Sequence, residues 1–140
     1  LYPGASALNL SHTSSGVFSS RLKQILVIDG TWPCAKKMMK LSTCLHGLPR
    51  ISFTTERVSE FAVKHQPLPG CLSTAESLHQ VLLELNRLGL EGTQGKEENL
   101  MEVFRKTVNQ QLELAADPSR NRYRPKPYRA PGERTVSRKW

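Results

Sequence analysis

The sequence predicts an α/β fold in which a parallel sheet is flanked by helices. Ile25–Ile28 is apolar at every position and mostly β-branched, as is typical of a strand that is buried on both faces of a parallel sheet. Residues 49–54 alternate enough for a second strand, and residues 59–64 suit a third short extended piece. Residues 73–88 combine a helix-capping pattern with an apolar stripe. At 140 residues, these elements indicate one domain.

Shorter elements are expected around the first strand, which spans residues 24–28. Residues 2–4 indicate a turn, because Pro3 fixes one backbone dihedral and Gly4 allows a positive φ angle. The serine-rich residues 11–20 indicate a surface loop. A helix should follow the strand over residues 33–41, because proline suits the first helical turn.

Two long helices are expected in the second half of the chain. The first begins at Ser73, where Glu76 completes the spacing of a capping box, and it ends at Gly89. Its apolar stripe comprises Ala75, Leu78, Val81, Leu82, Leu85 and Leu88. The second follows a loop at residues 93–96 and ends before Pro118. Its core positions are Leu100, Val103, Phe104, Val108 (or Thr107) and Leu112.

Composition restricts the class of protein. The chain is 38% hydrophobic, which can bury a modest core, and it has no run of eighteen apolar residues, so no membrane partner is expected. The three cysteines, Cys34, Cys44 and Cys71, form no Cys-x-x-Cys pair, so neither a zinc site nor a disulfide framework is predicted. Free thiols indicate a reducing compartment, and the expected localisation is intracellular, cytoplasmic or nuclear.

The positive charge is concentrated at the C-terminal end. Residues 117–140 hold eight Lys or Arg against two Asp or Glu, which gives +6 of the net charge of +8. Four prolines interrupt this stretch, and two tyrosines lie within it. We expect a disordered basic tail suited to a phosphate backbone, with a merely solubilising tail as the alternative.

Asp29 and Gly30 follow the apolar strand directly. In open α/β sheets, ligands bind beyond the carboxyl ends of the strands, and glycine lets backbone approach a ligand closely. A carboxylate at this point therefore predicts a functional site. The alternative is structural: Asp29 caps the next helix and Trp32 fills the core.

The chain resembles the DTW-domain family in four motifs that occur in the family's order. They are the glycine turn Leu1–Ala5, the Asp-Gly-Thr-Trp stretch Asp29–Trp32, the helix opening Ala35–Met38 and the Ser-Thr-x-Glu helix start in Leu72–Glu76. The resemblance covers roughly residues 1–90. It implies a SPOUT-like, knotted parallel sheet, with residues 1–116 as the C-terminal portion of a DTW domain that lacks its N-terminal part, and residues 117–140 as a separate tail.

The resemblance also implies an activity: transfer of the 3-amino-3-carboxypropyl group of S-adenosylmethionine to N3 of a uridine in tRNA. Three loops are expected to build the cofactor pocket, with Tyr2, Pro3, Gly4, Gly30, Thr31, Trp32, Leu72, Ser73 and Thr74 as contacts. Asp29 is the candidate base for the uridine N3 proton, or alternatively holds the amino group of the cofactor. Glu76 is expected to cap its helix and not to take part in catalysis.

The expected tRNA contacts are basic side chains on the first helix, in the loop after residue 63 and in the tail. They are Lys36, Lys37, Lys64, Arg122, Arg124, Lys126 and Arg129. One family motif, Ser-x-Tyr-x-aliphatic-Arg, is altered here to Ser59, Phe61 and Lys64. Lysine keeps the charge of arginine but lacks its bidentate fork. The alternative function is therefore an RNA-binding or assembly protein that keeps the fold without the chemistry. The pattern leaves the oligomeric state open.

Overall fold

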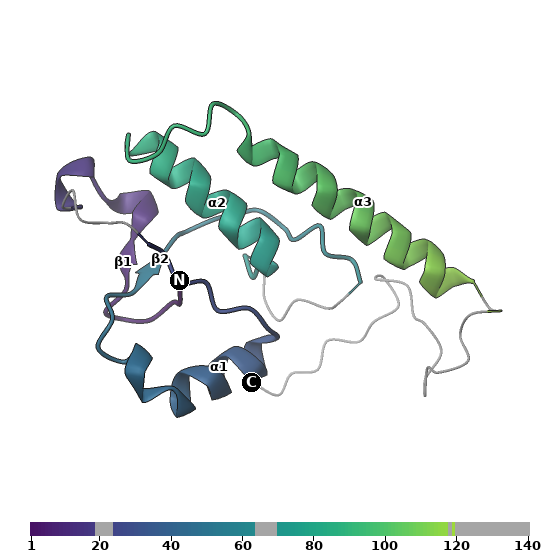
Figure 1. The fold of residues 1–140 in the computed structure, drawn as a ribbon, viewed down its shortest axis with the longest axis horizontal. Coiled ribbons are helices and arrows are strands. Elements are labelled where there is room, and N and C mark those ends of the chain that lie inside the picture. The colour runs from purple at the N-terminus through teal and green to yellow at the C-terminus, as the bar shows by residue number, and fades with distance from the viewer. Residues whose placement is uncertain (19–23, 64–69, 118, 120–140) are drawn as a thin grey trace.

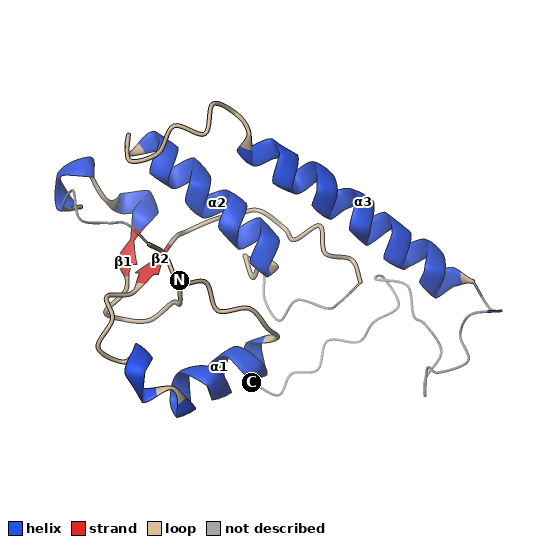
Figure 2. Ribbon diagram, in the orientation of Figure 1, coloured by secondary structure: helices blue, strands red, loops and turns tan. Residues whose placement is uncertain are grey.

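The computed structural model describes residues 1–18, 24–63, 70–117 and 119. Figure 1 and Figure 2 show the arrangement, in which α2 and α3 lie side by side. The helices are α1 (Trp32–Leu41), α2 (Thr74–Arg87) and α3 (Glu97–Ala116), the strands are β1 (Leu8–Asn9) and β2 (Ile51–Ser52), and the short 3-10 helices are η1 (Leu10–His12), η2 (Ser15–Val17) and η3 (Thr43–Leu45). No helix among the described residues is both long and apolar enough to cross a membrane.

The sheet is parallel, as the sequence predicts, but it is very small. β1 pairs with β2 so that Leu8 lies opposite Ile51 and Asn9 lies opposite Ser52. The Tyr2 N–H donates to the Ile51 carbonyl at 3.1 Å, which ties the first residues of the chain to β2. The sheet therefore fixes the N-terminal residues beside the segment that leaves β2.

The core lies between the small sheet and the C-terminal half of α2. Its fully covered side chains are Leu10, Val81, Leu85 and Leu88. Phe18, Ile25, Ile51 and Phe53 pack against this cluster from the surrounding segments. Removal of apolar side chains from water is the main force that holds such segments together, since few backbone ladder bonds are present.

Residues 24–28 do not form the predicted central strand. Ile25 packs against the core, but Leu26 is 54% exposed and Gln24 is exposed as well. An apolar run becomes a strand only where a neighbouring strand satisfies its backbone groups. Within the described residues, β1 and β2 pair only with each other, so this run is an extended connection with one side toward the core.

Two further expectations also need correction. The second strand occupies only Ile51–Ser52 of residues 49–54. Residues 59–61 belong to no strand, Ala62 and Val63 form a turn, and Lys64 lies outside the described residues. In place of a plain surface loop after residue 10, the chain forms η1 and η2. The Ser11 hydroxyl donates to Glu84 Oε1 at 2.8 Å, which fastens η1 to α2.

The three helices are confirmed within a residue or two. α2 has the predicted capping box, and Gly89 follows its end with a φ of 68°, a conformation that favours glycine. The buried face of α3 differs from the prediction: Val103 is 63% exposed, whereas Met101 is fully buried. Val108 is buried as expected.

The N-terminal turn does not require its glycine. The Ala7 N–H donates to the Gly4 carbonyl at 3.0 Å, so the turn is centred on Ala5 and Ser6. Gly4 is not among the described residues with positive φ, so the turn does not use the conformational freedom that glycine allows.

Candidate ligand pocket

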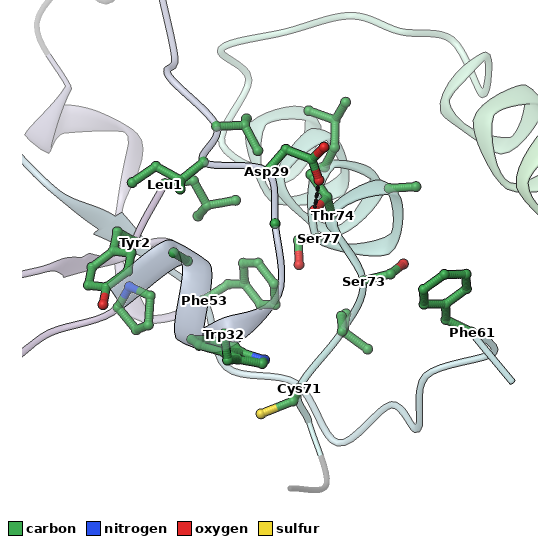
Figure 3. A pocket seen from close by; sticks show the side chains of 18 of the residues that line it. Leu1, Tyr2, Asp29, Trp32, Phe53, Phe61, Cys71, Ser73, Thr74 and Ser77 are labelled. Carbon is green, nitrogen blue, oxygen red and sulfur yellow. Dashed lines mark hydrogen bonds between the residues drawn. The ribbon is translucent and has the colours of Figure 1, made fainter. Parts of the chain in front are cut away.

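A pocket of about 1030 Å³ opens where the starts of α1 and α2 face the N-terminal residues. This volume is at the upper end of the range for small-molecule sites, roughly 300–1,000 Å³. Its walls come from residues 1–3, 27–33, 52–55 and 70–78, with Phe61, Leu100 and Phe104 on the remaining side. Figure 3 shows Asp29 and Thr74 between Leu1 and Tyr2 on one side and Phe61 on the other.

The structure brings most of the predicted cofactor contacts to this one pocket. Those that line it are Tyr2, Pro3, Gly30, Thr31, Trp32, Leu72, Ser73 and Thr74, together with Asp29. Gly4 does not line it, because the turn carries it away toward Arg50. The three loops that the family resemblance groups together therefore do meet in space.

Two of the predicted RNA contacts, Lys36 and Lys37, fall within the described residues. Lys36 and Lys37 are exposed on α1 and do not line the pocket. The predicted contacts outside the described residues are Lys64, Arg122, Arg124, Lys126 and Arg129.

Asp29 contacts α2 and does not cap α1. The Thr74 hydroxyl donates to Asp29 Oδ1 at 2.6 Å, while the N-cap of α1 is Thr31. Asp29 is exposed, so its carboxylate reaches the pocket with one oxygen already held by the first turn of α2. Trp32 is half-buried and lines the pocket; it is not a member of the buried core cluster.

The start of α1 depends on Gly30. Its φ of 151° is a conformation that side chains disfavour, and a Cβ there would lie 3.3 Å from Met38 Cε and 3.4 Å from Cys34 Cβ. Thr31, the N-cap, makes no side-chain capping bond. The backbone conformation at Gly30 thus turns the chain into α1 and leaves the Thr31 hydroxyl on the pocket wall.

The start of α2 is held by Glu76, which is 2% exposed. Its Oε2 accepts from the Ser73 N–H at 2.8 Å, and the Glu76 N–H donates to Ser73 Oγ at 3.3 Å, which completes the capping box. The N–H groups of Thr74 and Ala75 lie in the same first turn, where no intrahelical acceptor exists. Both residues line the pocket, so this helix end is suited to an anionic group.

Phe61 lines the side of the pocket that is formed with α3, and it belongs to segment 57–61. Glu60 makes two hydrogen bonds to Arg105, at 2.7 and 3.0 Å, and the bond from this guanidinium lowers the pKa of Glu60 below its ordinary value. The rings of Phe61 and Phe104 lie 5.8 Å apart at 46°. Segment 57–61 is therefore tied to α3 although it belongs to no strand or helix.

Several lining residues were absent from the predicted site. They are Phe53, Phe61, Cys71, Ser77, Leu100 and Phe104. Ser77 could have been found, because it lies three residues after Thr74 on the same face of a helix. Leu100 and Phe104 are predicted core positions of the last helix. No local sequence pattern indicates that they share a pocket with Phe61. The described residues contain no cluster of His, Cys, Asp and Glu that could hold a metal ion.

Among the curated proteins that are similar to this chain, three share the name tRNA-uridine aminocarboxypropyltransferase 2. The Drosophila melanogaster protein is 34% identical over 87 residues, which are 61% of this chain and 33% of the relative. The proteins of Macaca fascicularis and Mus musculus are each 36% identical over 78 residues, which are 54% of this chain and 25% of each relative. The chain thus spans a quarter to a third of the length of these relatives.

No solved structure gives a significant match to this chain. The sequence does match the family described as the DTW domain, over residues 1–112. This match covers every described helix and strand except the last turn of α3. The chain therefore belongs to the DTW domain family.

Proposed function

We propose that this chain carries the site for transfer of a 3-amino-3-carboxypropyl group from S-adenosylmethionine to N3 of a uridine in tRNA. The observation that carries the proposal is that residues 1–3, 29–32 and 71–74 converge on one pocket, with the carboxylate-bearing Asp29 among them. The shared name of the relatives supports the reaction class. The SPOUT-like, knotted arrangement belongs to the same proposal and rests on the family resemblance alone.

The residues present fit such a donor. The free N–H groups of Thr74 and Ala75 would hold its carboxylate at the positive end of α2. Trp32 and Phe53 offer aromatic surface for adenine, and Ser77 offers a hydroxyl group for the ribose. When bound, the donor would supply the electrophilic carbon of its aminocarboxypropyl group to N3, and the bond from this carbon to sulfur would break, which releases methylthioadenosine.

Asp29 removes the N3 proton of uridine in this proposal. Oδ1 accepts the Thr74 hydroxyl at 2.6 Å, which orients the carboxylate and leaves Oδ2 to take the proton. A general base must lie within hydrogen-bond reach of the proton that it removes, and the position of Asp29 on the pocket wall supports this role for a uracil bound in the pocket. In the alternative role, Asp29 holds the amino group of the donor through the same oxygen, Oδ2.

The tRNA is proposed to approach over the basic surface of α1, where Lys36, Lys37 and Lys40 are exposed. Phosphate contacts from lysine and arginine supply affinity that does not depend on sequence. The basic residues 117–140 would add to this affinity.

Nucleoside analysis tests the reaction directly. The chain is incubated with unmodified tRNA and S-adenosylmethionine, and the digested nucleosides are examined by mass spectrometry. We expect 3-amino-3-carboxypropyl-uridine and an equal amount of methylthioadenosine. Methylated uridine together with S-adenosylhomocysteine would contradict the assigned transfer, and tRNA binding without any product would favour the RNA-binding alternative.

The Asp29→Asn variant tests the role of the carboxylate. We expect turnover to fall on the order of a hundredfold, as is typical for loss of a general base, while the donor affinity changes little. Glu91→Gln is the matched control, because Glu91 is an exposed carboxylate outside the pocket. Loss of donor affinity with normal turnover at saturation would instead assign Asp29 to donor binding.

A further inference from the structure

Segment 57–61 crosses the first turns of α2 without forming a strand or helix. Arg57 Nη1 donates to His79 Nδ1 at 3.3 Å, and His79 is buried on the next turn of α2. The Ser59 hydroxyl donates to Glu76 Oε2 at 2.7 Å, and the Glu60 N–H donates to Glu76 Oε1 at 2.6 Å. Side-chain bonds to α2 therefore replace the strand ladder that this segment lacks.

Glu76 does more than its capping box requires. A capping glutamate needs only the N–H of the N-cap residue, here Ser73. The two additional donors come from Ser59 and Glu60, seventeen and sixteen residues earlier in the chain. The 2% exposure of Glu76 means that these donors supply the bonds that water would otherwise make. The carboxylate thus joins the start of α2 to the segment that bears Phe61.

The same segment is also fastened to α3. Glu60 bonds twice to Arg105, and the ring of Phe61 packs against that of Phe104. Both rings line the pocket with Leu100, and both are only partly buried. This end of the pocket is therefore an apolar surface with two tilted aromatic rings, and its position is set from two helices. The label of Ser73 lies next to that of Phe61 in Figure 3.

We propose that Phe61, backed by Phe104, is a stacking surface for a nucleobase in the pocket, and that Glu76 is the positioning residue that holds it there through Ser59 and Glu60. The inference rests on the proposed function, in which two ligands carry such a base: the donor has adenine and the tRNA has uracil. Aromatic side chains stack on any base, because every base has a π-face. Adenine and uracil would stack on the ring in the same way, so the experiment below decides which of the two bases binds there.

Calorimetric titrations with methylthioadenosine and, separately, with uridine monophosphate test the stacking surface. We expect Phe61→Leu to weaken binding of one of these probes about tenfold or more, the range for loss of base stacking. Phe61→Tyr keeps the ring and should bind that probe like the parent chain. Phe18→Leu is the matched control, since Phe18 packs on the core and does not line the pocket. The inference would be overturned if Phe61→Leu bound both probes as tightly as the parent chain does, or if the parent chain bound neither probe.

A double-mutant cycle tests the positioning role. Ser59→Ala removes the bond to Glu76 and also the acceptor of the Phe61 N–H, and we expect it to weaken the same probe severalfold, whereas Ser59→Thr keeps the hydroxyl and should preserve binding. In the Phe61→Leu background, Ser59→Ala should have no further effect, because the surface that it positions is gone. Additive losses would show that Ser59 and Glu76 act on the fold alone and would refute the positioning role.

The two proposals fail separately. If the parent chain forms aminocarboxypropyl-uridine but Phe61→Leu binds both probes normally, the stacking surface is refuted and the transfer reaction stands. Probe binding that depends on Phe61, without any transferred product, would keep the nucleobase site and refute the reaction.

Discussion

Helices α1 and α2 both begin at the pocket wall, and their first turns are held in different ways. The start of α2 is fixed by side chains, with Ser73 and Glu76 in a capping box and further bonds from Glu76 to Ser59 and Glu60. The start of α1 has no side-chain cap and is fixed by the backbone conformation of Gly30 and its close approach to the helix.

The difference separates polar groups that serve the fold from those that remain for a ligand. At α2, both carboxylate oxygens of Glu76 are already bonded within the chain. At α1, the Thr31 hydroxyl is not used for capping, and Asp29 uses one oxygen to contact Thr74. Variants at these positions should therefore divide into those that cost stability and those that cost function.

The largest loss of stability is expected for Glu76→Ala. It removes the acceptor of three donors at a buried position, and the free energy of unfolding should fall by about 3 kcal/mol. Urea denaturation measures this loss. Glu102→Ala is the control, because Glu102 is an exposed glutamate that pairs with Lys106 on the surface of α3. A loss below about 1 kcal/mol for Glu76→Ala would show that α2 does not depend on this carboxylate.

The next largest loss is expected for Gly30→Ala. The added Cβ meets Met38 and Cys34 at 3.3 and 3.4 Å while the backbone stays at a φ that alanine disfavours, so we expect about 1–2 kcal/mol of destabilisation. Gly47→Ala is the matched control, since a Cβ there has nothing within 4 Å and φ is not positive. Equal stabilities of the two variants in urea would mean that the start of α1 is not fixed at Gly30.

A smaller effect separates the two N-caps. Ser73→Ala removes a capping bond and should cost about 1 kcal/mol of unfolding free energy. Thr31→Ala removes none and should stay within about 0.5 kcal/mol. Thermal and urea unfolding of both variants gives the comparison. If Thr31→Ala destabilises the chain as much as Ser73→Ala, the two helix starts do not differ in the proposed way.

The smallest effect concerns the bond between segment 57–61 and α3. Arg105 lowers the pKa of Glu60 below its ordinary value of 4.5, so the ionised pair stabilises the fold above this pH, and its contribution is lost as the pH falls through the lowered pKa. Arg105→Gln should reduce the urea midpoint slightly at about pH 7 and not at about pH 3. A difference that persists at low pH would assign the role of Arg105 to packing.

Local patterns in the sequence were sufficient to predict the helices. The capping box at Ser73 and Glu76 and the positive φ at Gly89 involve neighbouring residues only, and both are confirmed. The bonds from Glu76 to Ser59 and Glu60 span sixteen residues or more, and no local pattern encodes them. A capping glutamate that is also a tertiary contact has the same sequence signature as one that is not.

The strand predicted at residues 24–28 does not form, and the buried face of α3 differs from the prediction, for a related reason. Composition favours a strand, but pairing depends on which other segments come close. α3 carries two apolar stripes, one with Val103 and one with Met101, and only its packing against α2 decides which is buried. The three loops of the pocket were identified from family motifs, whereas its α3 side at Phe104 depends on this same packing.

The pocket draws its walls from nearly the whole described chain, from Leu1 to Phe104. These walls meet only when segments far apart in the sequence are folded together, so a ligand that fits them binds the folded state and not the unfolded one. Thermodynamic linkage then stabilises the entire fold, by about 2.7 kcal/mol at a ligand concentration of 100 times Kd. A shift in melting temperature can therefore report occupancy of this pocket even before any catalytic assay, and candidate ligands can be ranked by that shift.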